Sequence, residues 1–328
     1  MIIENNDETV PSNVRAMRVR FYVYAAMCAA IAVTGVVASI YTGTGYGYVV
    51  FVGLPFLVGL FWGWFAGRDA VQAYGYAMYY MTISLVVAAV VMMAFALEGI
   101  VCVAMAAPFV WVMAAIGVLT GRLLHFVLGP FVPSTWFIVF TIALAPMLMG
   151  AEAAIAPAPP VYAVTTCIDI DAPRDRVWKH VVTFPELAPP TEFIFRAGVA
   201  FPKHARIEGE GVGAMRYCVF NTGEFVEPIA VWDEPSLLKF SVTENPAPLT
   251  ETSFYGEIHP PHLDGYMEAK QGQFKLIALP NGGTRIEGTT WYSHGLWPAS
   301  YWRLWSDPII HAVHGRVLAH IKTLAESE

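Results

Sequence analysis

Long apolar stretches, all located before residue 155, constrain this chain more than any other feature. A helix that crosses a bilayer needs roughly 20 apolar residues, at about 1.5 Å of length each. By this measure the first half of the chain contains five predicted spanning helices, at residues 21–41, 46–66, 76–97, 99–120 and 134–151. Only 14 % of all residues are charged and 56 % are hydrophobic, which also favours an integral membrane protein.

The third and fourth predicted helices form one apolar run, residues 77–120, which is twice the length of one crossing and contains a single carboxylate, Glu98. We predict a turn at Glu98-Gly99, because glycine tolerates the left-handed conformation that ends a helix and an acid is favourable at a helix N-terminus. Glu98, Cys102 and Met105 then share one helix face and form a candidate membrane-turn site. Soft sulfur ligands suit Cu(I), but these residues also pack helices, so no metal is predicted.

The basic residues near the spans predict the orientation of the chain, because Lys and Arg resist translocation. The basic residues all flank the ends of the spans that would face the same side of the membrane: Arg15, Arg18, Arg20, Arg68 and Arg122. This pattern predicts an inner-membrane protein with its N-terminus in the cytoplasm and, after five crossings, its C-terminal half outside. The polar segment 1–20 is typical of the start of an uncleaved anchor. A sixth span at residues 123–133 would put the C-terminal half in the cytoplasm, but this stretch is short, contains two prolines and favours an interfacial location.

Several function classes are disfavoured. The predicted spans contain no Lys, Arg, Asp or Glu, which proton and ion pathways usually require. A single histidine, His125, lies in the membrane half, so one chain offers no bis-histidine haem site. The second half carries 14 Lys and Arg against 20 Asp and Glu, a net charge of −6, which disfavours nucleic acid as a partner. The four cysteines do not predict a disulfide framework.

A linker rich in Ala and Pro, residues 152–160, separates the membrane half from a segment with a different pattern, residues 161–328. That segment begins with an alternating strand and a helix after Pro173, continues with about six strands separated by turn signals, and ends with a helix from Pro308 to Ala325. This order predicts an α+β domain in which a curved antiparallel sheet grips the long last helix.

Four stretches, "IDIDAPRDRVWKHVVTF", "GEGVGAMRYCVF", "WDEPSLLKFSV" and the last helix, resemble the helix-grip (SRPBCC) superfamily, which contains START domains and polyketide cyclase/dehydrases. The resemblance covers about residues 161–326, and the membrane half is similar to uncharacterised bacterial membrane regions joined to such domains. It implies an apolar cavity between the sheet and the last helix, which takes lipids or similar molecules. The stretch from Pro185 to Pro202 departs from the usual second helix of the superfamily.

Aromatic and histidine residues near the end of the chain are the candidates for the cavity or its mouth, because Trp and Tyr concentrate where one side is apolar and the other is wet. The candidates are Trp291, Tyr292, His294, Trp302, Trp305, His314, His259 and His262. The aromatic residues have an alternative role, which is to seal the hinge before the last helix. His259 and His262 with Asp264 offer metal ligands, but such loops are common on surfaces, so no metal or other cofactor is predicted.

Two functions remain open at this point. The first is membrane-anchored binding or transfer of a lipid or other apolar small molecule, with the lipid bilayer as the second partner. The second is a cyclase or hydratase type of enzyme in the same cavity, with a histidine or one of Glu224, Glu227 and Glu268 as acid or base. We favour binding, assign no catalytic residue and leave the oligomeric state open.

Overall fold

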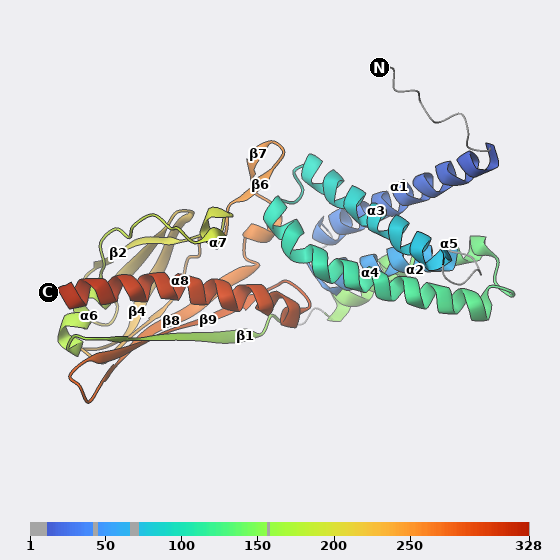
Figure 1. Cartoon of the computed structure of the whole chain (residues 1–328). Helices are drawn as coiled ribbons and strands as arrows, with labels where there is room; N and C mark the ends of the chain where they lie inside the picture. Colours follow the sequence, from blue (N-terminus) through green and yellow to red (C-terminus); the bar gives the residue numbers. More distant parts are fainter. Residues whose placement is uncertain (1–11, 42–44, 66–71, 156–157, 328) are drawn as a thin grey trace, which may run out of the picture. The chain divides into compact units, whose positions relative to one another are not determined.

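The computed structural model describes residues 12–41, 45–65, 72–155 and 158–327 (Figure 1). The chain divides into two compact units at residues 156 and 157. We call residues 1–156 the helical unit and residues 157–328 the C-terminal unit, and we describe each by itself.

Five helical segments make up the described part of the helical unit. They are α1 (Ser12–Tyr41), η2 with α2 (Val49–Gly53 and Leu54–Phe65), α3 (Gln72–Ala94), α4 (Ile100–Leu128) and α5 (Ser134–Ile155). Among the described residues, four helices are long and apolar enough to cross a membrane: α1, α3, α4 and α5. The remaining predicted span, 46–66, is the second along the chain. It is a shorter apolar segment, Val49–Phe65, which begins with a π-helical turn.

The helices α2 and α4 approach each other closely through glycines on both helices. A methyl group added to Gly59 would lie 1.8 Å from the carbonyl oxygen of Ala114, and one added to Gly117 would lie 2.2 Å from that of Phe56. Gly63 and Gly121 face the partner backbone in the same way, at 2.1 Å each. Two Gly-xxx-Gly pairs therefore face each other, which is a common way to pack helices in membranes.

We predict that Gly117→Ala lowers the thermal unfolding midpoint of the detergent-purified chain, because the added methyl group pushes α2 and α4 apart. Gly75→Ala in α3 is the matched control, because a methyl group there meets no atom within 4 Å. Alanine is better than glycine in a helix by about 1 kcal/mol, so this control should unfold at the same or a higher temperature. Equal midpoints for both variants would contradict the packing argument.

The turn at Glu98 exists, but its backbone differs from the prediction. The residue in the left-handed conformation is Ala96, with φ 53°. Gly99 is extended and caps the start of α4, with φ −99° and ψ 170°. The carboxylate of Glu98 accepts a hydrogen bond from the hydroxyl of Tyr46, which ties this turn to the segment before η2.

Helices α4 and α5 are longer than predicted. Helix α4 continues to Leu128, so residues 123–128 form its last turns rather than a separate interfacial segment, and Pro130 follows its end. Helix α5 continues to Ile155, which shortens the predicted linker 152–160. The carboxylate of Glu152 accepts a hydrogen bond from the backbone N–H of Val49 at 3.1 Å, and this contact fixes the last turns of α5.

The arginines used to predict the orientation do not all lie where the prediction placed them. Helix α1 begins at Ser12 rather than at residue 21, so Arg15, Arg18 and Arg20 lie within its first turns rather than before it. Arg122 lies within α4 rather than after a helix. Arg68 lies outside the described residues, as do residues 1–11 of the predicted N-terminal segment.

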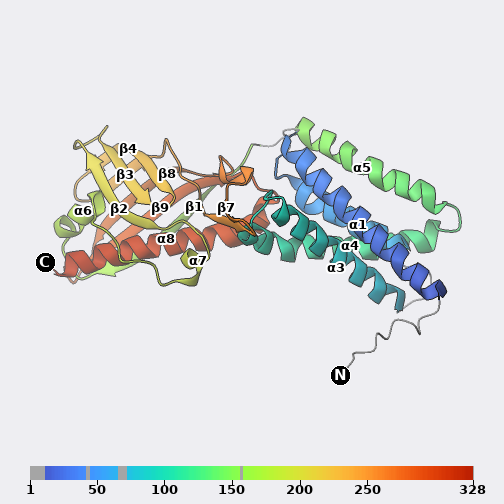
Figure 2. The ribbon, with the colours of Figure 1, turned by 90° about the horizontal axis from the view of Figure 1, so that it is seen from above.

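A curved antiparallel sheet and a long last helix form the C-terminal unit, as predicted. The strands lie in the order β1-β9-β8-β5-β4-β3-β2. Their bounds are β1 Val161–Ile170, β2 Pro202–Glu208, β3 Met215–Phe220, β4 Gly223–Asp233, β5 Leu237–Ser241, β8 Met267–Ala278 and β9 Thr284–His294. Helix α6 (Arg174–Val182) follows β1, and α8 (Ala299–Ser327) runs along one face of the sheet (Figure 2).

Three short elements were not predicted. The Pro-rich stretch contains α7, a single turn at Phe193–Arg196. A small hairpin, β6 (Glu251–Ser253) and β7 (Gly256–Ile258), and a 3-10 turn, η3 (Pro261–Leu263), lie between β5 and β8.

Helix α8 begins at Ala299, nine residues before the predicted start at Pro308. Asp307, the residue before Pro308, is a residue type that commonly caps helices, and Asp-Pro is a local start signal. Its carboxylate instead accepts hydrogen bonds from the hydroxyl of Tyr292 and from Nη2 of Arg303, the latter at 2.9 Å. These tertiary contacts outweigh the local cap signal, so the helix passes through Pro308.

Candidate functional site

A cavity of about 160 Å³ lies between α8 and the inner face of the sheet. Its wall is mainly apolar and includes Cys218, Phe220, Phe225, Phe240, Val242, Met267, Phe274, Ile309, Ile310, Val313 and Val317. The residues 245–248, which follow β5, close one side. The cavity is where the resemblance to helix-grip domains implied one.

One ion pair, Arg216 with Glu227, lies in this apolar wall. The two residues are direct neighbours across β3 and β4, and their side chains are 1 % and 7 % exposed. Nη1 of Arg216 donates a hydrogen bond to the carboxylate of Glu227, and Nε donates to the carbonyl oxygen of Val182 at 3.2 Å. Nη2 of Arg216 has no hydrogen-bond partner among the residues that the structure describes. The Nη2 amino group of a buried cation, which has two N–H bonds, is therefore available to a ligand.

Aromatic rings surround the guanidinium of Arg216. Its central carbon lies 5.4 Å from the ring centre of Phe240, 5.7 Å from that of Phe274 and 5.8 Å from that of Phe184. These distances allow cation–π attraction, which is stronger when the cation is desolvated. Burial is the largest influence on the pKa of Arg216 and lowers it, but the charge of Glu227 and its hydrogen bond, with smaller contributions from Cys218, together outweigh burial and raise this pKa. Arg216 therefore keeps its positive charge within the cavity wall.

The partner groups of this cation have raised pKa values. Burial raises the pKa of Glu227, and the charge of Arg216 acts against this rise. Burial also raises the pKa of Cys218, which lies two residues along β3 on the same face, to about 12. Cys218 is therefore a neutral thiol and not a nucleophile at neutral pH.

We predict that Arg216→Met destabilises the C-terminal unit by about 3–5 kcal/mol, because it leaves a buried carboxylate without its cation. The double variant Arg216→Met with Glu227→Leu should recover most of this loss, because an apolar pair of similar volume is often neutral in stability. Chemical unfolding of the purified protein measures both. A double variant no more stable than the single variant would contradict this account.

A second polar group lies where α8 meets β1 and β9. His314 lines the cavity, and its two ring nitrogens contact the hydroxyls of Thr166, at 3.1 Å, and Thr290, at 2.8 Å. Nδ1 of the exposed His311 contacts the same Thr166 hydroxyl at 2.7 Å. Burial, and then the neighbouring His311, lowers the pKa of His314 to about 4. His314 is therefore neutral at pH 7.

We predict an acid-dependent loss of stability that His314 controls. The pKa of His314 is 6.5 when unperturbed and about 4 in the folded chain. Between pH 4 and pH 6.5 the unfolded state therefore binds more protons than the folded state, so acid favours unfolding. The stabilisation is complete above pH 6.5 and falls by at most about 3 kcal/mol as the pH drops to 4.

Unfolding of wild type, His314→Gln and the control His259→Gln, whose histidine is exposed and does not line the cavity, measures this effect at pH 7 and pH 4.5. The wild type and the control should lose more stability between these pH values than His314→Gln does. Equal losses in all three proteins would contradict the role of His314.

Tyr292 is the second predicted residue that lines the cavity. Its hydroxyl contacts Oγ of Ser306 at 2.7 Å and donates to the carboxylate of Asp307. Burial, and then the hydrogen bond to Asp307, raises the pKa of Tyr292 to about 12. Tyr292 therefore stays protonated and joins β9 to the first third of α8.

The other predicted aromatic residues do not line the cavity. Trp291 belongs to the opposite face of β9, where Nζ of Lys239 lies 5.2 Å from its ring centre. His294 is buried, with its ring 5.8 Å from that of Tyr162. Trp302 is buried and Trp305 is 37 % exposed, and both lie on the first turns of α8 rather than in a hinge before it.

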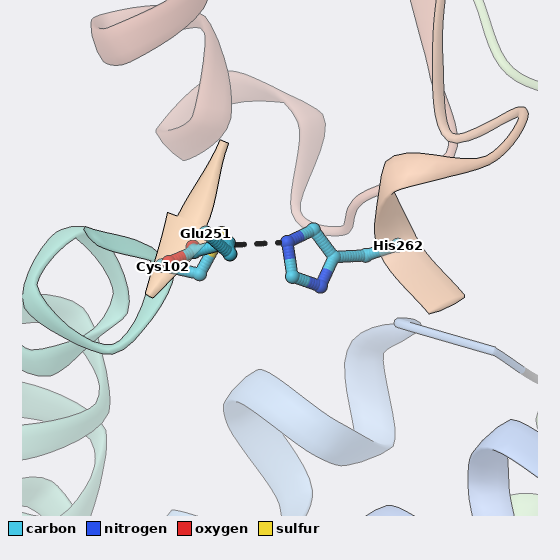
Figure 3. A group of neighbouring side chains, drawn as sticks. All are labelled: Cys102, Glu251 and His262. Atoms are coloured by element: carbon cyan, nitrogen blue, oxygen red, sulfur yellow. Dashed lines mark ion pairs between the residues drawn. The ribbon is translucent and has the colours of Figure 1, made fainter. Parts of the chain in front are cut away.

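The two loop histidines have separate partners and do not share one metal site with Asp264. Nε2 of His259, which is exposed, contacts the carboxylate of Asp264 at 2.8 Å. Nε2 of His262, in η3, lies 3.9 Å from Oε1 of Glu251 in β6 (Figure 3). Neither histidine lines the cavity.

The membrane-turn residues come from two elements. Glu98 lies in the turn before α4 and pairs with Tyr46, whereas Cys102 and Met105 lie on the first turns of α4.

The other two glutamates considered as acids or bases, unlike Glu227, do not line the cavity. Glu224 contacts Arg206 at 3.0 Å, and Glu268 pairs with Lys270, both at partly exposed positions.

Sequence reasoning missed Arg216 as a cavity residue. The signal was present in "MRYCVF", because alternation places Arg216 on the same face as Cys218 and Phe220. A charged residue on a strand usually points to water, so only the observed register shows that this face is the inner one.

Comparisons with solved structures match the C-terminal half. A protein from Nitrosospira multiformis is 22 % identical, with 49 % of this chain and 94 % of that chain covered and a TM-score of 0.32. Norcoclaurine synthase from Thalictrum flavum is 15 % identical, with coverages of 52 % and 98 % and a TM-score of 0.34. Aha1 from Colwellia psychrerythraea is 15 % identical, with coverages of 50 % and 96 % and a TM-score of 0.30.

No protein-family model matches the chain, and no curated protein matches it significantly. The three matches cover the half of the chain for which the sequence predicts a helix-grip fold, and at these identities they assign no function to it.

Proposed function

We propose that the C-terminal unit binds an apolar small molecule with a neutral hydrogen-bond acceptor, and that the apolar helices anchor it in a membrane. The observation that carries this proposal is the unpartnered Nη2 of Arg216 in a mainly apolar cavity wall. A buried donor without a partner costs about 1–3 kcal/mol, and a ligand oxygen would remove this cost.

The size of the cavity limits the ligand. A dry cavity of about 150 Å³ in another protein binds benzene. The cavity here, of about 160 Å³, therefore suits a ligand portion of about one ring in the conformation described. A whole lipid requires an outward movement of α8 or of residues 245–248.

The charge of the ion pair defines the ligand class further. Arg216 and Glu227 together carry no net charge when both are ionised, so a ligand carboxylate would add an uncompensated negative charge. A ketone, aldehyde or amide oxygen accepts a hydrogen bond without this cost.

The four long apolar helices support the anchoring part of the proposal. The arginine pattern favours a cytoplasmic N-terminus in the inner membrane, in line with the positive-inside rule. Five crossings, with the short segment Val49–Phe65 as one of them, would place the C-terminal unit outside the cytoplasm, whereas four crossings would place it in the cytoplasm.

A cyclase or hydratase type of enzyme is the second candidate, because the carboxylate of Glu227 lines the cavity and its pKa is raised. The hydrogen bond from Arg216 occupies that carboxylate, so we favour binding.

Three probes of similar shape test the ligand class: acetophenone, isopropylbenzene and benzoate. We predict that the full chain in lipid nanodiscs binds acetophenone most tightly and benzoate most weakly, as measured by ligand-observed NMR with empty nanodiscs as the blank. In the variant Arg216→Met with Glu227→Leu, acetophenone binding should weaken by about tenfold or more, from the loss of a bond to a charged donor, whereas isopropylbenzene binding stays similar.

Two results would contradict the proposal. If no probe binds the wild-type chain above the blank, the cavity is not a binding site for single-ring molecules. If acetophenone and isopropylbenzene lose affinity equally in the double variant, Arg216 does not recognise the acceptor. Faster exchange of the carbonyl oxygen of acetophenone with isotopically labelled water, by reversible hydration and with a loss in Glu227→Gln, would support the hydratase instead.

A further inference from the structure

The β6–β7 hairpin of the C-terminal unit ends in two exposed aromatic residues. Ser253 pairs with Gly256, so Phe254 and Tyr255 form the tip, and they are 62 % and 74 % exposed. Tight turns usually contain Gly, Asn, Asp, Pro or Ser, because these residues suit the backbone. Here Gly256, with φ 97°, meets the backbone requirement, so turn geometry does not explain the two rings.

The hairpin has a sequence suited to an apolar surface. The segment from Thr252 to Gly256 carries no charge, and the side chains at the tip combine a large apolar area with one hydroxyl. Aromatic residues of this kind concentrate at the interface between a membrane and water. A two-stranded hairpin is only marginally stable alone, and further packing stabilises it. Because the two rings at its tip are mostly exposed, we expect them to contact something outside the unit.

The hairpin lies at the end of the unit where the chain enters. The register pairs Val161, the first residue of β1, with Ser293, and Met267 with His294. Helix α8 begins five residues after His294, and both ribbon views show the hairpin at this same end (Figure 1). Leu304 on α8, which is also exposed, belongs to this end.

Chain length ties this end to the membrane. Helix α5 ends at Ile155 and β1 begins at Val161, which is six peptide steps later. At about 3.5 Å for each step, the two residues are at most about 20 Å apart. Helix α5 is one of the four helices able to span a bilayer. The end of the unit that carries the hairpin therefore cannot move far from the surface of the bilayer that α5 crosses.

We infer that the tip formed by Phe254 and Tyr255 inserts into the lipid interface of the membrane in which the chain is anchored. This inference rests on the proposed anchoring. It assigns a lipid-contact surface to the C-terminal unit, at the end where β9 passes into α8. A protein surface as the contact of the tip is the alternative outcome of the test.

Site-directed cysteine labelling of the full chain tests the inference. Phe254→Cys and Tyr255→Cys, each with Cys167→Ser to remove an exposed thiol, carry a polarity-sensitive NBD fluorophore in phosphatidylcholine nanodiscs. Asn281→Cys is the matched control, because it is exposed in the β8–β9 turn at the opposite end of the sheet. The Cys167→Ser chain without an added cysteine gives the labelling background.

We expect blue-shifted emission at both tip positions and quenching by doxyl-labelled lipid at least about twofold stronger than at position 281, since interfacial insertion buries groups by about 5–10 Å. Quenching at both tip positions no greater than at 281 would overturn the inference. So would blue-shifted emission without lipid quenching, which would show that the tip is buried against protein.

The same samples separate this inference from the proposed function. Co-elution of the chain with nanodiscs reports anchoring, and acetophenone binding reports the cavity. If the chain co-elutes and binds acetophenone but the tip labels respond like the control, only the hairpin inference fails. A chain that does not enter nanodiscs overturns both the anchoring and the hairpin contact.

Discussion

The packing of α8 against the seven-stranded sheet is the interaction on which the C-terminal unit depends. Ile310, Val317, Leu318 and Ile321 of α8 are buried, and α6 adds Trp178 to the same apolar core. The bonds of the Tyr292 hydroxyl to Ser306 and Asp307 hold the first third of the helix to β9. The cavity lies along the length of α8 that includes Ile309, Val313 and Val317, so the same contacts that hold the helix also define the binding volume.

The ion pair in the cavity wall is difficult to explain by stability alone. Removing two charges from water costs several kcal/mol for each ion, and well-packed apolar residues of similar volume are often as stable or more stable. Hydrogen bonds to every donor of Arg216 would be needed to offset its desolvation cost, yet Nη2 has no partner within the described chain. A ligand that supplies the missing acceptor accounts for a charge pair that packing does not require. Arg216, rather than the aromatic residues near α8, is therefore the centre of the candidate site.

Periodicity predicted most of the C-terminal fold, because its strands are half buried and alternate clearly. Helix α6 shows the corresponding helical period, since Val177, Trp178 and Val181 share one side of the helix and all three are buried. The start of α8 could not be predicted, because Asp307-Pro308 is a good local cap signal and only the contacts with Tyr292 and Arg303 overrule it. The site was predicted less well than the fold: composition pointed to Tyr292 and His314, but the inward direction of Arg216 depends on strand register.

In the helical unit, the short helix α2 is buried among the other helices, whereas the long helices expose apolar side chains. Because α2 is surrounded by protein, its length does not have to match the thickness of a bilayer. Nine of the twelve residues of α2 are buried, and the glycines at its contact with α4 bring the two backbones together. Residues 49–65 would extend about 26 Å at 1.5 Å each, less than the roughly 30 Å of a hydrocarbon core. The long helices instead expose large apolar side chains, including Val86, Leu119 and Phe140. Protein surrounds the short segment, and the four long helices present the apolar exterior that a bilayer solvates, which fits a membrane protein.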